Sequence, residues 1–151
     1  MRCTKSAANT GATCDVQDES PRMKYLLLIY NDEKLVDALP AGRADAMMRD
    51  CFNHADELRG QGALLESQQL EAPSTAKTVR IRNGRTSVVD GPFAETKEML
   101  GGYNIIEASS LDEAVRIASE FPWTETGCVE IRPIRDIAAV RQRVGADEQP
   151  A

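Results

Sequence analysis

The most informative stretch of the chain is an unbroken apolar run, YLLLIY at residues 25–30, within a strand predicted over residues 24–30. Successive side chains of a strand point to opposite faces, so each face of this one receives three large side chains. They are Tyr25, Leu27 and Ile29 on one face, and Leu26, Leu28 and Tyr30 on the other. A strand with one face in water would alternate with polar residues. We therefore expect helices to cover one face and a second subunit or a ligand to cover the other.

Apolar residues at spacings of three and four predict two helices, over residues 41–59 and 111–120. Ser109 or Ser110 is expected to cap the second helix, with Glu113 placed to complete a capping box. Shorter apolar or alternating runs predict three more strands, at residues 63–70, 102–108 and 128–134.

The clearest local signal is TVRIRNGRTSVVDG, in which Asn83-Gly84 separates two alternating segments. Asn-Gly favours the two-residue type I′ turn, so this segment is predicted to be a β-hairpin. The turn fixes the pairs across the hairpin: Arg82 with Arg85, Ile81 with Thr86, and Val79 with Val88. One face is then apolar and the other basic. The period of two places Asp90 on the apolar face, pointing toward the core.

The predicted order is β-α-β, a hairpin, then β-α-β, which is typical of an α+β, ferredoxin-like split βαβ fold with the hairpin inserted. We expect a disordered extension at residues 1–22, one domain over 23–137, and a flexible tail over 138–151. In such a fold helices cover only one face of the sheet. A homodimer packed sheet to sheet would bury the other face.

The composition and charge of the chain argue against nucleic-acid and membrane partners. The chain has 24 acidic and 18 basic residues, for a net charge of −6. Because no basic patch interleaves with aromatic residues, we expect no nucleic-acid partner. No apolar run is long enough to cross a bilayer, and the N-terminal segment lacks the apolar centre of a secretory signal. We therefore expect a cytoplasmic protein without a membrane partner.

The sequence gives no sign of a metal or a cofactor. Its four cysteines show neither metal-ligand nor redox spacing and are expected to be reduced thiols: Cys3, Cys14, Cys51 and Cys128. No phosphate loop, dinucleotide fingerprint or cofactor-lysine motif is present. A Ser–His–Asp set would depend on the one histidine of the chain, His54.

The segment DGPFAETKEMLGGY at residues 90–103 resembles the signature of the YCII-related proteins, in the DGPF subgroup. MKYLLLIYNDE, DELRGQGALLESQQL and VEIRPI add to a resemblance that covers roughly residues 23–134. It implies a dimeric α/β barrel with a cleft on the open sheet face. Related proteins are suspected enzymes with a histidine–aspartate pair in the cleft. The subgroup tends to have an aromatic residue at the position of His54. The histidine proposed for the related proteins is therefore not assigned to His54.

The DGPF segment also supplies the candidate site. Asp90 is placed to act as a general base or to orient a ligand, and turn chemistry in Asp-Gly-Pro also explains it. Glu95, Lys97 and Glu98 form either the rim of a cleft at the dimer interface or an exposed, solvated loop. Three further residues are candidates for lining the cleft, although packing explains each of them as well: Phe93, Tyr103 and His54.

Two functions remain open from the sequence. One is binding of a small polar molecule in the dimer cleft by a non-catalytic or regulatory protein. For this role the resemblance implies a sigma factor as partner, because members of the subgroup are often encoded near such factors. The other is a small-molecule enzyme with acid–base chemistry centred on Asp90.

Overall fold

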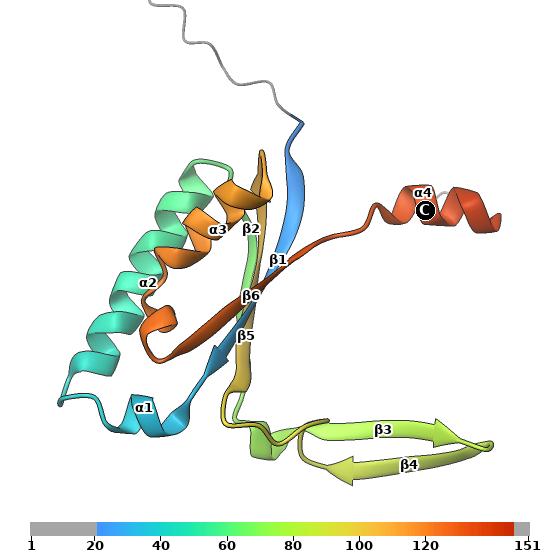
Figure 1. Ribbon diagram of the computed structural model, residues 1–151, viewed down its shortest axis with the longest axis horizontal. Coiled ribbons are helices and arrows are strands. Elements are labelled where there is room, and N and C mark those ends of the chain that lie inside the picture. Colours follow the sequence, from blue (N-terminus) through green and yellow to red (C-terminus); the bar gives the residue numbers. More distant parts are fainter. Residues whose placement is uncertain (1–20, 147–151) are drawn as a thin grey trace, which may run out of the picture.

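A computed structural model of the chain describes residues 21–146, shown in Figure 1. The predicted N-terminal extension lies outside these residues except for its last two positions. The helices and strands follow in this order: β1 Met23–Asn31, α1 Glu33–Asp37, α2 Arg43–Gly60, β2 Leu64–Gln69, β3 Lys77–Arg82, β4 Arg85–Asp90, β5 Met99–Ala108, α3 Leu111–Ser119, β6 Gly127–Pro133 and α4 Ile137–Val144. Two short 3₁₀ turns lie at Pro73–Thr75 and Pro122–Glu125.

Four strands form one sheet in the order β2-β5-β1-β6, with every neighbouring pair antiparallel. Two β-α-β units, β1-α2-β2 and β5-α3-β6, therefore interleave, since each has a strand of the other between its own two strands. Helices α2 and α3 lie on one face of this sheet (Figure 1). The predicted α+β class is confirmed: the structure has a four-stranded antiparallel sheet and a hairpin that forms a sheet of its own.

The core lies between the sheet and the two helices. Leu27 and Ile106 are fully buried on neighbouring strands, and Phe121, which follows α3, is 2% exposed. Burial of such side chains contributes about 1.5–3 kcal/mol each. The opposite face of β1 carries Leu26 and Leu28, which are only half-buried. Both faces of β1 are therefore apolar. One face is buried against the helices, and no helix in the described part of the chain covers the other.

Helix α3 starts with a capping box. Ser110 is the N-cap, and its hydroxyl accepts a hydrogen bond from the Glu113 backbone N–H at 3.1 Å. The Glu113 carboxylate accepts from the backbone N–H of Ser109 and from its hydroxyl, the latter at 2.7 Å. These bonds favour the charged form, so they hold the pKa of Glu113 below its usual value.

Replacing Glu113 with alanine is expected to lower the stability at pH 7 by about 1 kcal/mol, the usual effect of losing a helix cap. Because the folded-state pKa is lowered, the charged carboxylate stabilises the fold above about pH 4.3, the ordinary value. This contribution is lost as the pH falls through the folded-state pKa. Urea unfolding of both proteins between pH 7 and pH 3 should show the difference shrinking in acid. Glu57→Ala, at an exposed position of α2, is the control and should show no such trend.

The hairpin β3–β4 forms a two-stranded sheet of its own. Its predicted register is confirmed, with Arg82 paired to Arg85, Ile81 to Thr86 and Val79 to Val88. Asn83 and Gly84 have φ angles of 52° and 72°, which the type I′ turn requires. The side chains of Val79, Ile81 and Val88 are 61–62% exposed. The apolar face of the hairpin is thus uncovered in the single chain.

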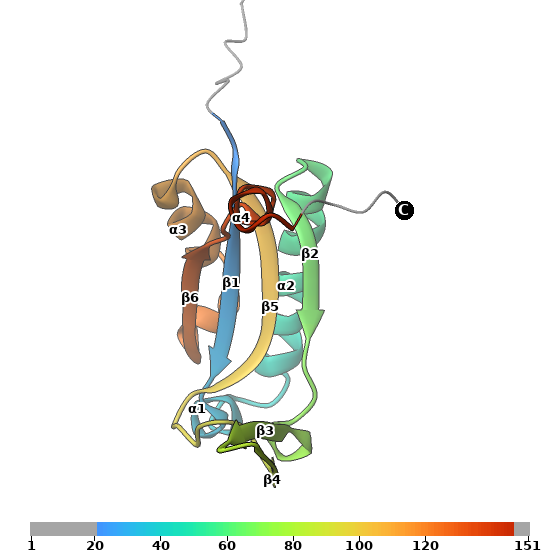
Figure 2. The same cartoon turned by 90° about the vertical axis from the view of Figure 1, so that its right-hand side faces the viewer.

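Helix α4 occupies part of the segment predicted to be a flexible tail. Asp136 caps it by accepting hydrogen bonds from the backbone N–H groups of Ala138 and Ala139. No residue of this helix is buried. Figures 1 and 2 show α4 and the hairpin projecting from opposite ends of the sheet, both on the side that helices α2 and α3 do not cover. Between residues 21 and 146, no helix combines the length and apolar character needed to cross a bilayer.

Candidate functional site

The structure disperses the residues predicted for the site. Asp90 ends β4 with its side chain 82% exposed and pairs with Lys77 across the hairpin. The prediction that it points toward the core is wrong, because the hairpin does not join the main sheet and its apolar face has no core beneath it. Phe93 is 82% exposed, and Glu95 is exposed in the same loop.

The end of that loop does border the open sheet face. Thr96, Lys97 and Glu98 line a shallow hollow together with side chains of β1 and β6. The Cys128 thiol lies 3.2 Å from a Glu98 carboxylate oxygen. Burial, followed by this carboxylate, raises the pKa of Cys128. The ammonium of Lys97 lies 3.4 Å from the carboxylate of Asp32, a buried residue that caps α1. These contacts hold the loop against the body of the domain.

Tyr103 and His54 lie in two other places. On the open face the Tyr103 hydroxyl donates to a Glu66 carboxylate oxygen at 2.7 Å, and this bond is the main cause of the raised pKa of the tyrosine. His54 lies in the helix layer, where its ring packs edge-on against Phe121 with centroids 4.7 Å apart. Its Nε2 atom is 3.4 Å from a Glu120 oxygen. His54 therefore does not reach the open face, and its surroundings fit a packed boundary residue.

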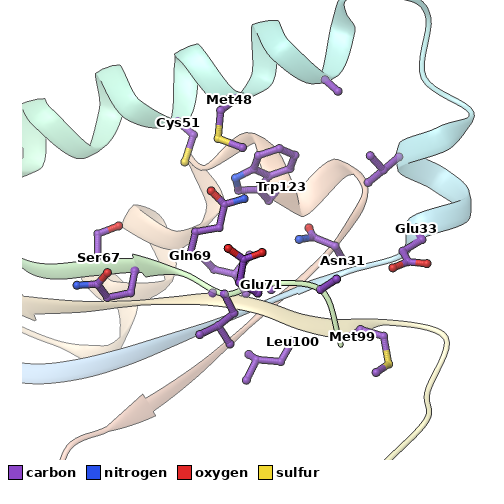
Figure 3. Close-up of a pocket in the computed structure, with 18 of the residues that line it drawn as sticks. Asn31, Glu33, Met48, Cys51, Ser67, Gln69, Glu71, Met99, Leu100 and Trp123 are labelled. Carbon is purple, nitrogen blue, oxygen red and sulfur yellow. The ribbon is translucent and has the colours of Figure 1, made fainter. Parts of the chain in front are cut away.

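A cavity of about 600 Å³ lies elsewhere, between α2 and the sheet at the end of the molecule nearest α1 (Figure 3). Residues from β1, α1, α2, β2, β5 and both 3₁₀ turns line it. None of the seven residues predicted for the site is among them. Cavities of about 300–1,000 Å³ with mostly apolar walls are the usual size for small-molecule sites.

The helix side of the cavity is apolar. Met48, Cys51 and Phe52 approach from α2, and Trp123 approaches from the 3₁₀ turn before β6 (Figure 3). Burial raises the pKa of the Cys51 thiol, and a hydrogen bond with the Trp123 side chain only partly opposes this. A raised pKa keeps the thiol protonated at neutral pH, so Cys51 contributes polarisable surface and not a nucleophile.

The sheet side of the cavity is polar and incompletely paired. The side-chain oxygen of Asn31 is buried without a hydrogen-bond partner. Asn104 is 2% exposed, and its side chain forms no hydrogen bond with any residue in the range 21–146. Ser67 and Gln69, from β2, add a hydroxyl and an amide to the same wall. Buried amides normally have partners because an unmade hydrogen bond costs about 1–3 kcal/mol. These groups are therefore free to bond a molecule that enters the cavity.

The charges around the cavity have one sign. Four exposed carboxylates line it, from Glu33 and Asp37 on α1, Asp45 on α2, and Glu71 after β2. Among the lining residues in the described range 21–146 there is no lysine, arginine or histidine. Within residues 21–146 no group of three or more His, Cys, Asp or Glu side chains is arranged to hold a metal ion.

Sequence reasoning missed this cavity because its walls come from segments far apart in the chain. Helix α1 is only five residues long and has no apolar period to detect. One signal was present: Asn104 lies between the apolar strand residues Tyr103 and Ile105, on the face that also carries Ile106. A polar side chain on the helix-covered face of a core strand indicates a local interruption of the core.

The fold and the cavity together define a small α+β domain with a cavity of ligand size between its helix layer and its sheet. The model of the YCII-related domain family matches residues 23–138, so the chain belongs to that family. It is 38% identical over 114 residues to an uncharacterized protein of Rhizobium meliloti (strain 1021), an alignment that covers 74% of this chain and 92% of the relative.

A solved structure also resembles the chain at low sequence identity. It is that of 5-chloro-2-hydroxyhydroquinone dehydrochlorinase (TftG) from Burkholderia phenoliruptrix AC1100, in complex with 2,5-dihydroxybenzoquinone. The match covers 75% of this chain and 94% of that chain, at 15% identity and a TM-score of 0.39.

Proposed function

We propose that this protein binds a small molecule in the cavity between α2 and the sheet. The observation that carries the proposal is the pair of unpaired amides, Asn31 and Asn104, on one wall of a cavity of about 600 Å³. A ligand that forms hydrogen bonds with these amides would stabilise the fold, because the amides lack these bonds when the cavity is empty. The DGPF segment supports placing the chain in that subgroup of the family. The strand order supports the ferredoxin-like plan.

Binding is favoured over catalysis by the groups that line the cavity. Cys51 is held protonated by its raised pKa, and the described residues place no histidine or lysine there as a base or a nucleophile. The alternative, acid–base chemistry at Asp90, would place the reaction on an exposed carboxylate that already pairs with Lys77. Such a site would require a partner surface to exclude water from it.

Trp123 provides the direct test, because it is the only tryptophan of the chain and it lines the cavity. The neutral fluorescent probe N-phenyl-1-naphthylamine should bind and receive energy from Trp123. Ala44→Phe, which adds a ring at the cavity wall, should weaken this binding about tenfold or more, a loss of about 1.4 kcal/mol. Ala38→Phe, at an exposed position outside the lining, is the control. Equal binding by both variants would show that the probe sits elsewhere and would refute the proposal.

Asn104→Leu is expected to separate stability from binding. Leucine is similar in size to asparagine and leaves no buried polar group unpaired, so the free energy of unfolding should rise by about 1–3 kcal/mol. Affinity for a ligand that bonds the amide should fall. Differential scanning fluorimetry with and without such a ligand measures both effects. The exposed Asn53→Leu should change neither, and a destabilised Asn104→Leu protein would mean that this amide is already paired.

We also propose that two copies associate through their open sheet faces. Leu26 and Leu28 form an apolar strip there that helices do not cover, and the hairpin, whose apolar side chains are exposed, projects on the same side of the molecule. Isolated two-stranded hairpins are marginally stable in water, which favours an arrangement in which this one packs against a second copy. In such an assembly the hollow beside Lys97 and Glu98 would lie at the interface.

A further inference from the structure

We infer that the ligand of the cavity is an organic cation, an amine or amidine joined to an apolar body. This inference rests on the proposed binding function and specifies its ligand class. In the described part of the chain, all charged residues that line the cavity are carboxylates: Glu33, Asp37, Asp45 and Glu71. With no cationic side chain in the lining, a phosphate or carboxylate ligand would meet only like charge. The net charge of −6 extends the same negative potential over the whole chain and attracts cations toward the site.

The carboxylates alone would not define a site, but the buried amides point to a ligand independently. Asn104 is 2% exposed, has no partner within residues 21–146, and lines the same cavity as the carboxylates. Its oxygen and that of Asn31 can each accept a hydrogen bond from an N–H donor. An ammonium or amidinium group offers several such donors. The polar wall is therefore suited to the same charged group that the carboxylates attract.

An inorganic cation fits the cavity less well than an organic one. No cluster of three or more potential ligand side chains is arranged for a metal in the described part of the chain. The carboxylates come from three separate segments, α1, α2 and the residues after β2. They remain exposed, so they avoid the desolvation cost of buried charge. Carboxylates spread around the entrance favour a cation whose charge is carried on a larger molecule.

The apolar wall supplies the place for the rest of the molecule. Phe52 and Trp123 present aromatic surface, and Met48 adds a flexible thioether. Aromatic faces attract organic cations as well as apolar groups. In Figure 3, Glu71 points from the sheet edge into the space below Trp123, with the amides of Gln69 and Asn31 on either side. A ligand with an ammonium near Glu71 and its apolar part against Trp123 satisfies both walls.

The test compares three probes that share a phenyl ring and differ in charge: 2-phenylethylamine, 2-phenylethanol and 3-phenylpropionate. Titrations are followed by the fluorescence of Trp123 at pH 7 in low salt. The amine is expected to bind about tenfold more tightly than the alcohol, and the carboxylate more weakly than both. The difference in affinity between the amine and the alcohol should shrink in about 1 M NaCl, where charges are screened beyond about 3 Å.

A pair of matched variants assigns the effect to the cavity. Glu71→Gln should weaken amine binding about fivefold and leave alcohol binding unchanged, since only the charge is removed. Glu95→Gln removes a charge from the loop outside the cavity and should change neither. Equal affinities for amine and alcohol, or tighter binding of the carboxylate, would overturn the choice of cation while leaving the binding site intact. No response of Trp123 to any of the three probes would overturn the site and the inference together.

Discussion

Gly127→Ala is expected to destabilise the fold more than an alanine substitution at any other glycine of the four-stranded sheet. Gly127 begins β6 and pairs with Asn31 at the end of β1. A Cβ atom there would overlap the carbonyl oxygen of Tyr30 and lie 2.8 Å from its carbonyl carbon. Both are backbone atoms of the central strand, so the clash cannot be relieved by a side-chain rotation. The strands must separate at this end.

We expect this substitution to lower the free energy of unfolding by about 3 kcal/mol, near the upper end for overpacking. The thermal midpoint should fall by about 10 °C for a domain of this size. Calorimetry or circular dichroism measures the shift. Gly60→Ala is the control, because Gly60 lies in α2 with nothing within 4 Å of the added atom and has no positive φ. A Gly127→Ala protein as stable as this control would mean that β1 and β6 do not approach as closely as described.

Leu27→Ala is expected to have a comparably large effect. Leu27 is fully buried between the sheet and the helices, so removing its side chain leaves a cavity in a closed core. Such substitutions usually cost about 2–5 kcal/mol. The neighbouring Leu26 has the same chemistry but lies on the open face and is only half-buried in the single chain. Comparing the two leucines separates the core from the proposed subunit interface.

The two variants should respond differently to protein concentration. Leu27→Ala should lose stability at every concentration, since its contacts lie within one chain. If copies pair through their open faces, Leu26→Ala should weaken the association, seen by analytical ultracentrifugation as more monomer at micromolar concentration. A wild-type protein that sediments as a stable monomer, with Leu26→Ala unchanged from it, would contradict the proposed pairing.

The parts of the fold that were predictable are those set by local chemistry. The Asn83-Gly84 turn fixed the register of the hairpin, because only one alignment of its strands satisfies a two-residue loop. The apolar run at residues 25–30 identified a central strand, since no edge strand would carry so many large side chains on both faces. Alternation along the hairpin assigned its two faces correctly. It did not reveal whether the apolar face is covered, and this is why Asp90 was misplaced.

The candidate site was less predictable because tertiary structure creates it. Trp123 follows a proline in a short turn, and Asn31 ends a strand, so neither stands out along the chain. They meet only because α2 and the 3₁₀ turn before β6 cover the same end of the sheet. The charged segment at residues 90–98 is conspicuous in the sequence but contributes no residue to the lining of the cavity. Most of its side chains are exposed, which is common for charges beside a turn.

The projecting hairpin has a practical consequence. Its tip at Asn83 and Gly84 lies away from the sheet, the helices and the cavity (Figure 1). Exposed loop tips tolerate insertions well, because few backbone contacts depend on them. A short epitope or a fluorescent dye attached there would leave the folded body undisturbed. In a paired assembly, energy transfer between two such dyes would then report how the copies are oriented.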